Sequence, residues 1–259
     1  MLWDGGDAMD YEKLLNLAAE LGYQLMFSGA EIYRVEESMH RLLEAYGLER
    51  PEIFAIPNCV IVSAVTPEGH LLTRMRRVPG HGTDIELLER CNALCRQLCA
   101  QTPPPETVQL LTLPEQTRRY SPRQVLLGYG MAPAFFAPLF GGGWQDAASA
   151  FFCGLGVGAC LLYGGRFLGR NSFFRTAVCS AVASLLVQLL AGLGLGESID
   201  TVTISVLMVL VPGVALTSAM REIMAGDTIS ALSRTADAIL TAAAIALGTA
   251  AGLALGQLA

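Results

Sequence analysis

Residues 237–257 are DAILTAAAIALGTAAGLALGQ, and no charged residue follows Asp237 in this stretch. An α-helix rises about 1.5 Å per residue, so about 20 apolar residues cross the roughly 30 Å hydrocarbon core of a bilayer. The stretch therefore predicts a transmembrane helix. Residues 173–193, FFRTAVCSAVASLLVQLLAGL, form a second clear run of the same kind.

Three further apolar runs lie in the second half of the chain, at about 124–140, 147–163 and 200–220. The first of these holds Pro133 and Pro138, which predict a kinked helix. Over all 259 residues, 53% are hydrophobic and 15% are charged, whereas soluble domains are about one-quarter charged. We therefore expect residues 121–259 to form an all-α polytopic membrane domain of five transmembrane helices.

The first half of the chain has the charge density and periodicity of a folded α+β domain, over residues 1–120 with a linker. Apolar stripes predict a helix over 10–27 and a second one opened by a Ser28–Glu31 capping box. Runs rich in β-branched residues predict strands at 53–56, 60–65 and 71–78. A second capping box, Thr83 with Glu86, predicts a helix that continues to about Ala100, before three prolines.

The distribution of arginine predicts the orientation in the membrane. Lys and Arg are absent from the loops that hold Gln145 and Asp146 and, later, Glu197 and Asp200. The alternate loops carry arginines, at Arg118, Arg119, Arg123, Arg166, Arg170, Arg175, Arg221 and Arg234. By the positive-inside rule the amino terminus is cytoplasmic and the carboxyl terminus is outside. The first thirty residues have no basic-then-apolar signal peptide, so we expect the first apolar run to direct insertion.

The fourth apolar run contains Val211-Pro212-Gly213 about 11 residues, or roughly 17 Å, after its start. Proline removes a helix hydrogen bond, and glycine is the weakest helix former after proline. The pair therefore predicts a helix break near the middle of the membrane. Transporters use such breaks to direct a half-helix amino terminus at an anionic substrate, but packing kinks are equally common, and the sequence leaves both open.

Polar residues after this break are the candidates for substrate binding and proton coupling. Arg221 can hold a carboxylate with two parallel hydrogen bonds, and Thr217 can add one more. Asp227 or Asp237 can carry a coupling proton. In the alternative interpretation these are ordinary loop charges, and the arginines only fix the topology.

Two glycine series mark faces where membrane helices can approach closely. Gly154 and Gly158 are four residues apart, as are Gly248, Gly252 and Gly256. Small residues at this spacing allow close helix packing, either within this chain or against another subunit.

Cys91, Cys95 and Cys99 recur every four residues and offer either a thiolate metal site or core packing. Their spacing matches no common zinc motif, so core packing is favoured and no metal is expected.

Arg74, Arg76 and Arg77 suggest an anion funnel or, more simply, a solvated strand. His70 and His81 are isolated. No Walker loop, Rossmann fingerprint or hydrolase motif occurs, so we expect no enzyme, no catalytic residue, no cofactor and no ATP-driven pump. The net charge of −6 argues against nucleic acid as a partner.

Two stretches carry a resemblance to a known family. Residues 29–37, GAEIYRVEE, followed by Tyr46-Gly47 and Gly82-Thr83-Asp84, resemble the opening of the bacterial threonine/serine exporter family. Pro212-Gly213, Leu216-Thr217, Arg221-Glu222 and Gly226-Asp227 resemble its signature after the fourth membrane helix. The resemblance covers about residues 10–257.

The resemblance implies export of small metabolites across the bacterial inner membrane, driven by the proton-motive force. Some members are single fused chains that export threonine and serine, and others pair a larger subunit with a small membrane subunit and are associated with succinate and related dicarboxylates. This chain ends after its fifth apolar run, so it resembles the larger subunit. The expected partners are that small membrane subunit, the lipid bilayer, a carboxylate or amino-acid substrate and further copies of the chain. A non-transporting membrane scaffold or regulatory subunit is the alternative.

Overall fold

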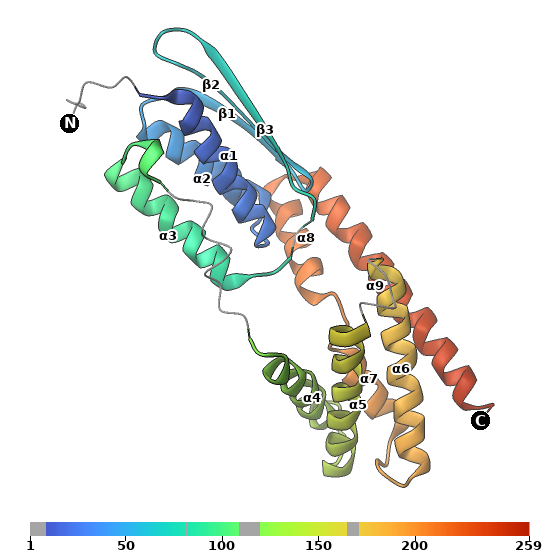
Figure 1. The fold of residues 1–259 in the computed structure, drawn as a ribbon. Helices are drawn as coiled ribbons and strands as arrows, with labels where there is room; N and C mark the ends of the chain where they lie inside the picture. Colours follow the sequence, from blue (N-terminus) through green and yellow to red (C-terminus); the bar gives the residue numbers. More distant parts are fainter. Residues whose placement is uncertain (1–8, 81, 109–119, 165–170, 259) are drawn as a thin grey trace. The chain divides into compact units, whose positions relative to one another are not determined.

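A computed structural model describes residues 9–80, 82–108, 120–164 and 171–258 (Figure 1). The chain forms two compact units. The amino-terminal unit consists of Met1–Arg118 with Ser218–Ser233, and the apolar unit consists of Arg119–Thr217 with Arg234–Ala259. Ser218–Ser233 therefore groups with the amino-terminal residues, although the sequence placed it in the membrane domain. Arg118, Arg119, Arg166, Arg170 and His81 lie outside the described residues, as does most of the predicted linker.

Helices α1 (Tyr11–Phe27) and α2 (Ile32–Ala45) supply most of the core of the amino-terminal unit. The buried residues include most members of the two apolar stripes, namely Leu14, Leu15, Ala18, Leu21, Leu25, Ile32, Val35, Met39, Leu42 and Leu43. Leu17, Ala19 and Met26 of α1 are buried as well. Burying one such large side chain stabilises the fold by about 1.5–3 kcal/mol. Gly47, with φ +85°, follows α2 in the left-handed conformation, which is a common end for a helix.

The capping box predicted at Ser28 and Glu31 is wrong. Ser28 Oγ donates to the Leu25 carbonyl at 2.8 Å and so belongs to the end of α1. Glu31 is the residue that precedes α2, but its side chain makes no capping hydrogen bond. Its carboxylate binds two arginines instead.

Strands β1 (Glu49–Ile56), β2 (Cys59–Val65) and β3 (Leu71–Arg77) form an antiparallel sheet in the order β1-β2-β3. Val60, Val62 and Ala64 are buried on its inner face. Gly69, with φ +87°, occupies the predicted turn between β2 and β3. β1 begins earlier than expected, with a pairing irregularity between Glu49 and Glu52.

Helix α3 (Ile85–Gln101) completes the predicted order of this unit, followed by the short 3₁₀ helix η1 (Pro105–Thr107). Its cap is Asp84, whose carboxylate accepts from Leu87 N at 3.0 Å, and not the predicted Thr83. Cys91 and Cys95 are buried in the core. Burial raises the pKa of Cys91 to about 11 and that of Cys95 to about 12, so both thiols stay protonated at neutral pH. The described residues hold no group of three metal ligands.

The apolar unit is helical: α4 (Pro122–Leu139), α5 (Trp144–Tyr163), α6 (Ser172–Gly192), α7 (Ile199–Leu207), the first turn of α8 (Gly213–Ala225) and most of α9 (Thr228–Gly256). Within the described residues, three helices are long and apolar enough to cross a membrane: α5, α6 and α9. They correspond to the predicted runs at 147–163, 173–193 and 237–257. α4 starts with the polar residues Arg123 and Gln124, and the run at 200–220 is divided between α7 and α8.

Each glycine series lies where two helices of the apolar unit meet. A Cβ added at Gly154 would overlap the Tyr129 carbonyl oxygen, and one at Gly158 would overlap the Tyr129 side chain, so α5 packs closely on α4. Gly248, Gly252 and Gly256 of α9 likewise approach α6, at the Ala177 and Ala181 carbonyls and at Gln188. Gln188 Nε2 also donates to the Gly252 carbonyl at 3.1 Å. The glycines thus serve packing within the chain.

Asp146 joins two loops of the apolar unit, a role that no sequence pattern indicated. The residue is 2% exposed. Its Oδ1 accepts from the backbone N–H groups of Glu197 at 2.7 Å and Ser198 at 3.0 Å, and its Oδ2 accepts from Gly143 N at 3.1 Å. These charge-assisted bonds fix the start of α5 to the loop before α7.

We expect Gly248→Ala to destabilise the apolar unit by about 1–3 kcal/mol, because the new methyl group overlaps the α6 backbone. The matched control is Gly128→Ala in α4, where an added Cβ meets nothing within 4 Å and alanine favours the helix. Thermal unfolding of both variants in detergent micelles measures the difference. Equal melting temperatures for the two variants would show that α9 does not pack on α6 through Gly248.

Candidate functional site

The helix break predicted at Pro212-Gly213 is confirmed. α7 ends at Leu207, residues 208–211 form turns and a bend, and α8 begins at Gly213. The proline ring crowds the carbonyl four residues earlier and offers no N–H, which favours a break here, although α4 continues through Pro133 and Pro138. A Cβ added at Gly213 would meet nothing within 4 Å, so close packing in the described chain does not explain this glycine.

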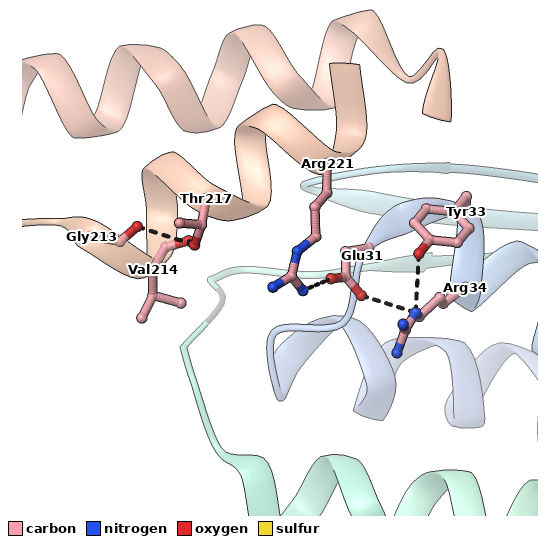
Figure 2. A network of polar contacts seen from close by, with 7 residues as sticks. All are labelled: Glu31, Tyr33, Arg34, Gly213, Val214, Thr217 and Arg221. Atoms are coloured by element: carbon pink, nitrogen blue, oxygen red, sulfur yellow. Dashed lines mark hydrogen bonds and ion pairs between the residues drawn. The ribbon is translucent and has the colours of Figure 1, made fainter. Parts of the chain in front are cut away.

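Thr217 lies one turn into α8 (Figure 2). Its hydroxyl is within hydrogen-bond distance of the Gly213 carbonyl at 3.2 Å and the Val214 carbonyl at 3.0 Å. The hydroxyl proton is therefore used inside the helix. The side chain is exposed, and the lone pairs of its oxygen are available to a donor on a ligand.

Arg221 binds a carboxylate from the other end of the chain. Its Nη1 donates to Glu31 Oε1 at 2.8 Å, across 190 residues of sequence (Figure 2). The second oxygen, Glu31 Oε2, lies 3.2 Å from Arg34 Nε, which also donates to the Tyr33 hydroxyl. Two guanidinium groups thus flank one carboxylate.

Burial within this network is uneven. The Glu31 side chain is 9% exposed and that of Arg221 is 61% exposed. A carboxylate this deeply buried needs paired donors, because an uncompensated buried charge is costly. A guanidinium offers five N–H donors, so one bond to Glu31 leaves several of those on Arg221 facing outward. This arrangement can accept a second carboxylate, or can exchange Glu31 for one.

A second acidic group lies in the same unit. Gly226, with φ +93°, separates α8 from α9, and Asp227 N donates to the Glu222 carbonyl at 2.9 Å. Glu222 is fully buried. Asp227 Oδ2 is also buried and accepts no hydrogen bond from the described residues. Asp227 is near enough to Glu36 for its charge to affect ionisation there.

Glu36 links this acidic group to the sheet. Its Oε1 accepts from Ala55 N at 2.7 Å. Burial raises the pKa of Glu36, the Ala55 N–H lowers it by less, and the charge of Asp227 raises it again. Glu36 therefore takes up a proton more readily than an exposed glutamate does.

The predicted site residues divide between the two units. Arg221 and Asp227 belong to the amino-terminal unit, whereas Pro212, Gly213, Thr217 and Asp237 belong to the apolar unit. Asp237 is exposed, and its carbonyl accepts from Thr241 Oγ1 at 2.8 Å. Sequence reasoning missed Glu31 and Glu36 as partners of this site. Both lie in the quoted GAEIYRVEE stretch, but only the fold shows that Glu31 faces Arg221.

The sequence profile of one protein family, described as putative threonine/serine exporter, matches residues 16–256. The chain belongs to this family. A threonine/serine exporter of Corynebacterium glutamicum is 25% identical over 235 residues, which are 88% of this chain and 48% of the relative. A probable succinate transporter subunit, YjjP of Klebsiella aerogenes, is 24% identical over 246 residues, which are 90% of each chain.

A third relative is a yeast protein. Pheromone-regulated membrane protein 10 of Debaryomyces hansenii is 30% identical over 178 residues, which are 64% of this chain and 16% of that protein. The chain thus spans about half of the corynebacterial relative and about a sixth of the yeast one. No solved structure matches the chain. Membership in a membrane exporter family agrees with the three apolar helices of the structure.

The Glu31–Arg221 pair is expected to contribute measurably to stability. In a double-mutant cycle with Glu31→Gln and Arg221→Gln, we expect a coupling free energy of about 1–2 kcal/mol, because Glu31 is buried. Glu37 and Arg41 give the matched control cycle, since both are exposed and such pairs contribute about 0.5 kcal/mol or less. Denaturant unfolding measures both cycles. Equal coupling in the two would mean that Glu31 and Arg221 do not interact as placed.

Glu36 is expected to give a pH-dependent effect. Its folded-state pKa is raised, so its contribution to stability is full below the unfolded pKa and is lost as pH rises through the folded pKa. Glu36→Gln keeps an acceptor for Ala55 N–H and removes the charge. This variant should melt at a higher temperature than the parent at pH 7.5, and the difference should vanish near pH 4. An advantage that persists at pH 4 would contradict the ionisation argument; Glu37→Gln is the exposed control.

Proposed function

We propose that this chain is the larger subunit of a proton-motive-force-driven exporter in the bacterial inner membrane. Its substrates are small carboxylates of the succinate type, or threonine and serine, and it works with a small membrane partner subunit. The family supports membrane export, and the alignment with a probable succinate transporter subunit over 90% of both chains supports the two-component form. It is a transporter and not an enzyme.

The observation that carries the proposal is the carboxylate bound by Arg221. Succinate, threonine and serine all contain a carboxylate, and Arg221 shows in this structure that it can bind one from Glu31. A substrate carboxylate would bind to the outward N–H groups of Arg221 or replace Glu31. Pro212, Gly213 and Thr217, which belong to the apolar unit, are proposed as further substrate-binding residues.

Proton coupling is assigned to Asp227, with Asp237 as the second candidate. Asp227 has a buried oxygen without a hydrogen bond in the described chain, and Glu36 nearby has a raised pKa. Protonation of either carboxylate would reduce the negative charge on α2 and at the α8–α9 junction. Substrate release and proton uptake could then be linked through the charges around Arg221.

The proposed topology has five spans with the amino-terminal unit in the cytoplasm. α5, α6 and α9 account for three of them, and α4 and the broken α7–α8 segment would supply the others. The positive-inside distribution of arginine supports this orientation. The alternative function, a non-transporting scaffold or regulatory subunit, rests on the groove that the amino-terminal unit presents between α2 and β1.

Efflux of labelled succinate and threonine from cells that make this chain, with and without the small partner, tests the proposal. We expect efflux of at least one compound that requires both chains and stops when an uncoupler is added. Membrane insertion of both chains is verified by fractionation. Unchanged retention of both compounds, with both chains inserted, would favour the scaffold function.

Arg221→Gln is expected to reduce that efflux at least tenfold while the protein still inserts and assembles. Glutamine has no positive charge and so cannot form an ion pair with a carboxylate. Arg41→Gln is the control, because Arg41 is an exposed arginine of the same unit whose acid partner, Glu37, is also exposed. Transport rates normalised to membrane protein give the comparison. Retained transport in Arg221→Gln would exclude Arg221 from substrate binding.

A further inference from the structure

Both outer strands of the three-stranded sheet have backbone groups that point away from β2. Ala55 N donates to Glu36 and not to β2, so the backbone groups of Ala55, and of Ile53 two residues earlier, face outward from β1. On β3, two flanking hydrogen bonds, from Thr66 N to the His70 carbonyl and from Val78 N to the Asn58 carbonyl, fix which residues direct their backbone groups toward β2. They direct the backbone groups of Thr73 and Met75 outward from β3.

The outer edge of β1, where Glu36 of α2 already accepts from Ala55 N, lies along a groove of about 860 Å³ whose other wall is α2. The groove is acidic: four carboxylates, Glu36, Glu37, Glu44 and Glu52, face one guanidinium and one imidazole, those of Arg41 and His40. Its floor is partly apolar, with Ile53, Phe54 and Ile61. A groove between a helix and an edge strand suits an extended, basic and apolar segment that adds a strand.

β3 has the composition that this groove requires. Its sequence, LLTRMRR, contains three arginines and no acid. Leu71 and Met75 are 69% and 70% exposed. Arg74 and Arg76 have acidic partners on α1, Glu12 at 3.7 Å and Glu20 at 2.8 Å. Arg77, however, has no carboxylate within 4.0 Å in the described part of the chain, so its charge is available to a neighbour.

We propose that β3 of a second copy of this chain adds to β1 in this groove, so that the sheets of neighbouring copies join edge to edge. A contact between two β1 edges would set four carboxylates against four, and a contact between two β3 edges would set arginines against arginines. Pairing of unlike edges avoids both repulsions. It makes a head-to-tail contact, which closes into a ring or extends through further copies.

The register of side chains favours parallel addition. In one copy Ile61 pairs with Phe54 on one side and with Met75 on the other, which forms an apolar row on the outer face. Parallel pairing of β3 with β1 keeps the outer faces of both sheets on the same side, and it can place Met75 of one copy beside Phe54 of the next. Methionine sulfur packs favourably against aromatic rings. This inference does not depend on the exporter function.

Disulfide crosslinking of the purified full chain in detergent tests the contact. The variant carries Phe54→Cys and Met75→Cys, with Cys59→Ser to remove the native thiol that lies on the outer face. Within one copy the two new cysteines are two strand spacings apart, about 9.5 Å, which exceeds the roughly 7 Å that a disulfide can span. A disulfide between them must therefore join two copies.

Oxidation should give a ladder of dimers and larger species for the double variant, and no ladder for either single variant or for Phe54→Cys with Gln97→Cys on α3. A dimer formed by Phe54→Cys alone would show a symmetric β1 contact and overturn the proposal. Absence of any crosslink from the double variant would overturn it as well.

Light scattering gives a second, independent measurement that needs no cysteine. The parent chain should be larger than a monomer, and Arg77→Glu should shift it toward the monomer, whereas Arg96→Glu on the exposed face of α3 should not. A monomeric parent chain at micromolar concentration would overturn the proposal. The proposal would also be overturned if the groove binds a different protein and the chain itself stays monomeric.

Discussion

The proline at 212 imposes the constraint from which the rest of the arrangement follows. α7 ends at Leu207 inside the apolar unit, and a new helix, α8, begins at Gly213, directly after the proline that favours the break. From Ser218 onward that helix belongs to the amino-terminal unit, and Gly226 then turns the chain into α9. Arg221 is therefore part of a unit that is made of Met1–Arg118 together with Ser218–Ser233.

This arrangement gives Arg221 an internal ligand. The buried Glu31 carboxylate is compensated by Arg34 from its own helix and by Arg221 from α8, so one carboxylate connects two segments that are 190 residues apart. The exposed side of Arg221 is free to meet an anion from solution. In the proposed transporter, a guanidinium that is already bonded to a carboxylate of the protein would exchange it for a substrate carboxylate, which suits a protein that must release its substrate as well as bind it.

Local patterns predicted the elements well, and long-range pairing escaped them. The apolar stripes of α1 and α2, the hairpin strands, the break at Pro212 and the core position of Cys91 and Cys95 all follow from periodicity or from the chemistry of proline. The capping residues were wrong at Ser28 and Thr83, because a carboxylate or hydroxyl can serve several partners and only the fold selects one. Glu31 facing Arg221, and Asp146 binding three backbone N–H groups, depend on contacts that no spacing along the chain encodes.

Hydrogen exchange of the chain, reconstituted in lipid nanodiscs with its small partner, tests whether Glu31 holds Arg221 until a substrate carboxylate replaces it. Peptides from the start of α2 and from residues 218–233 should exchange faster when succinate or threonine is added, because Glu31 loses a partner. The same peptides in Arg221→Gln should exchange quickly without substrate and should not respond to it. Identical protection with and without both compounds in the parent chain, at concentrations that support transport, would contradict the exchange of carboxylates at Arg221.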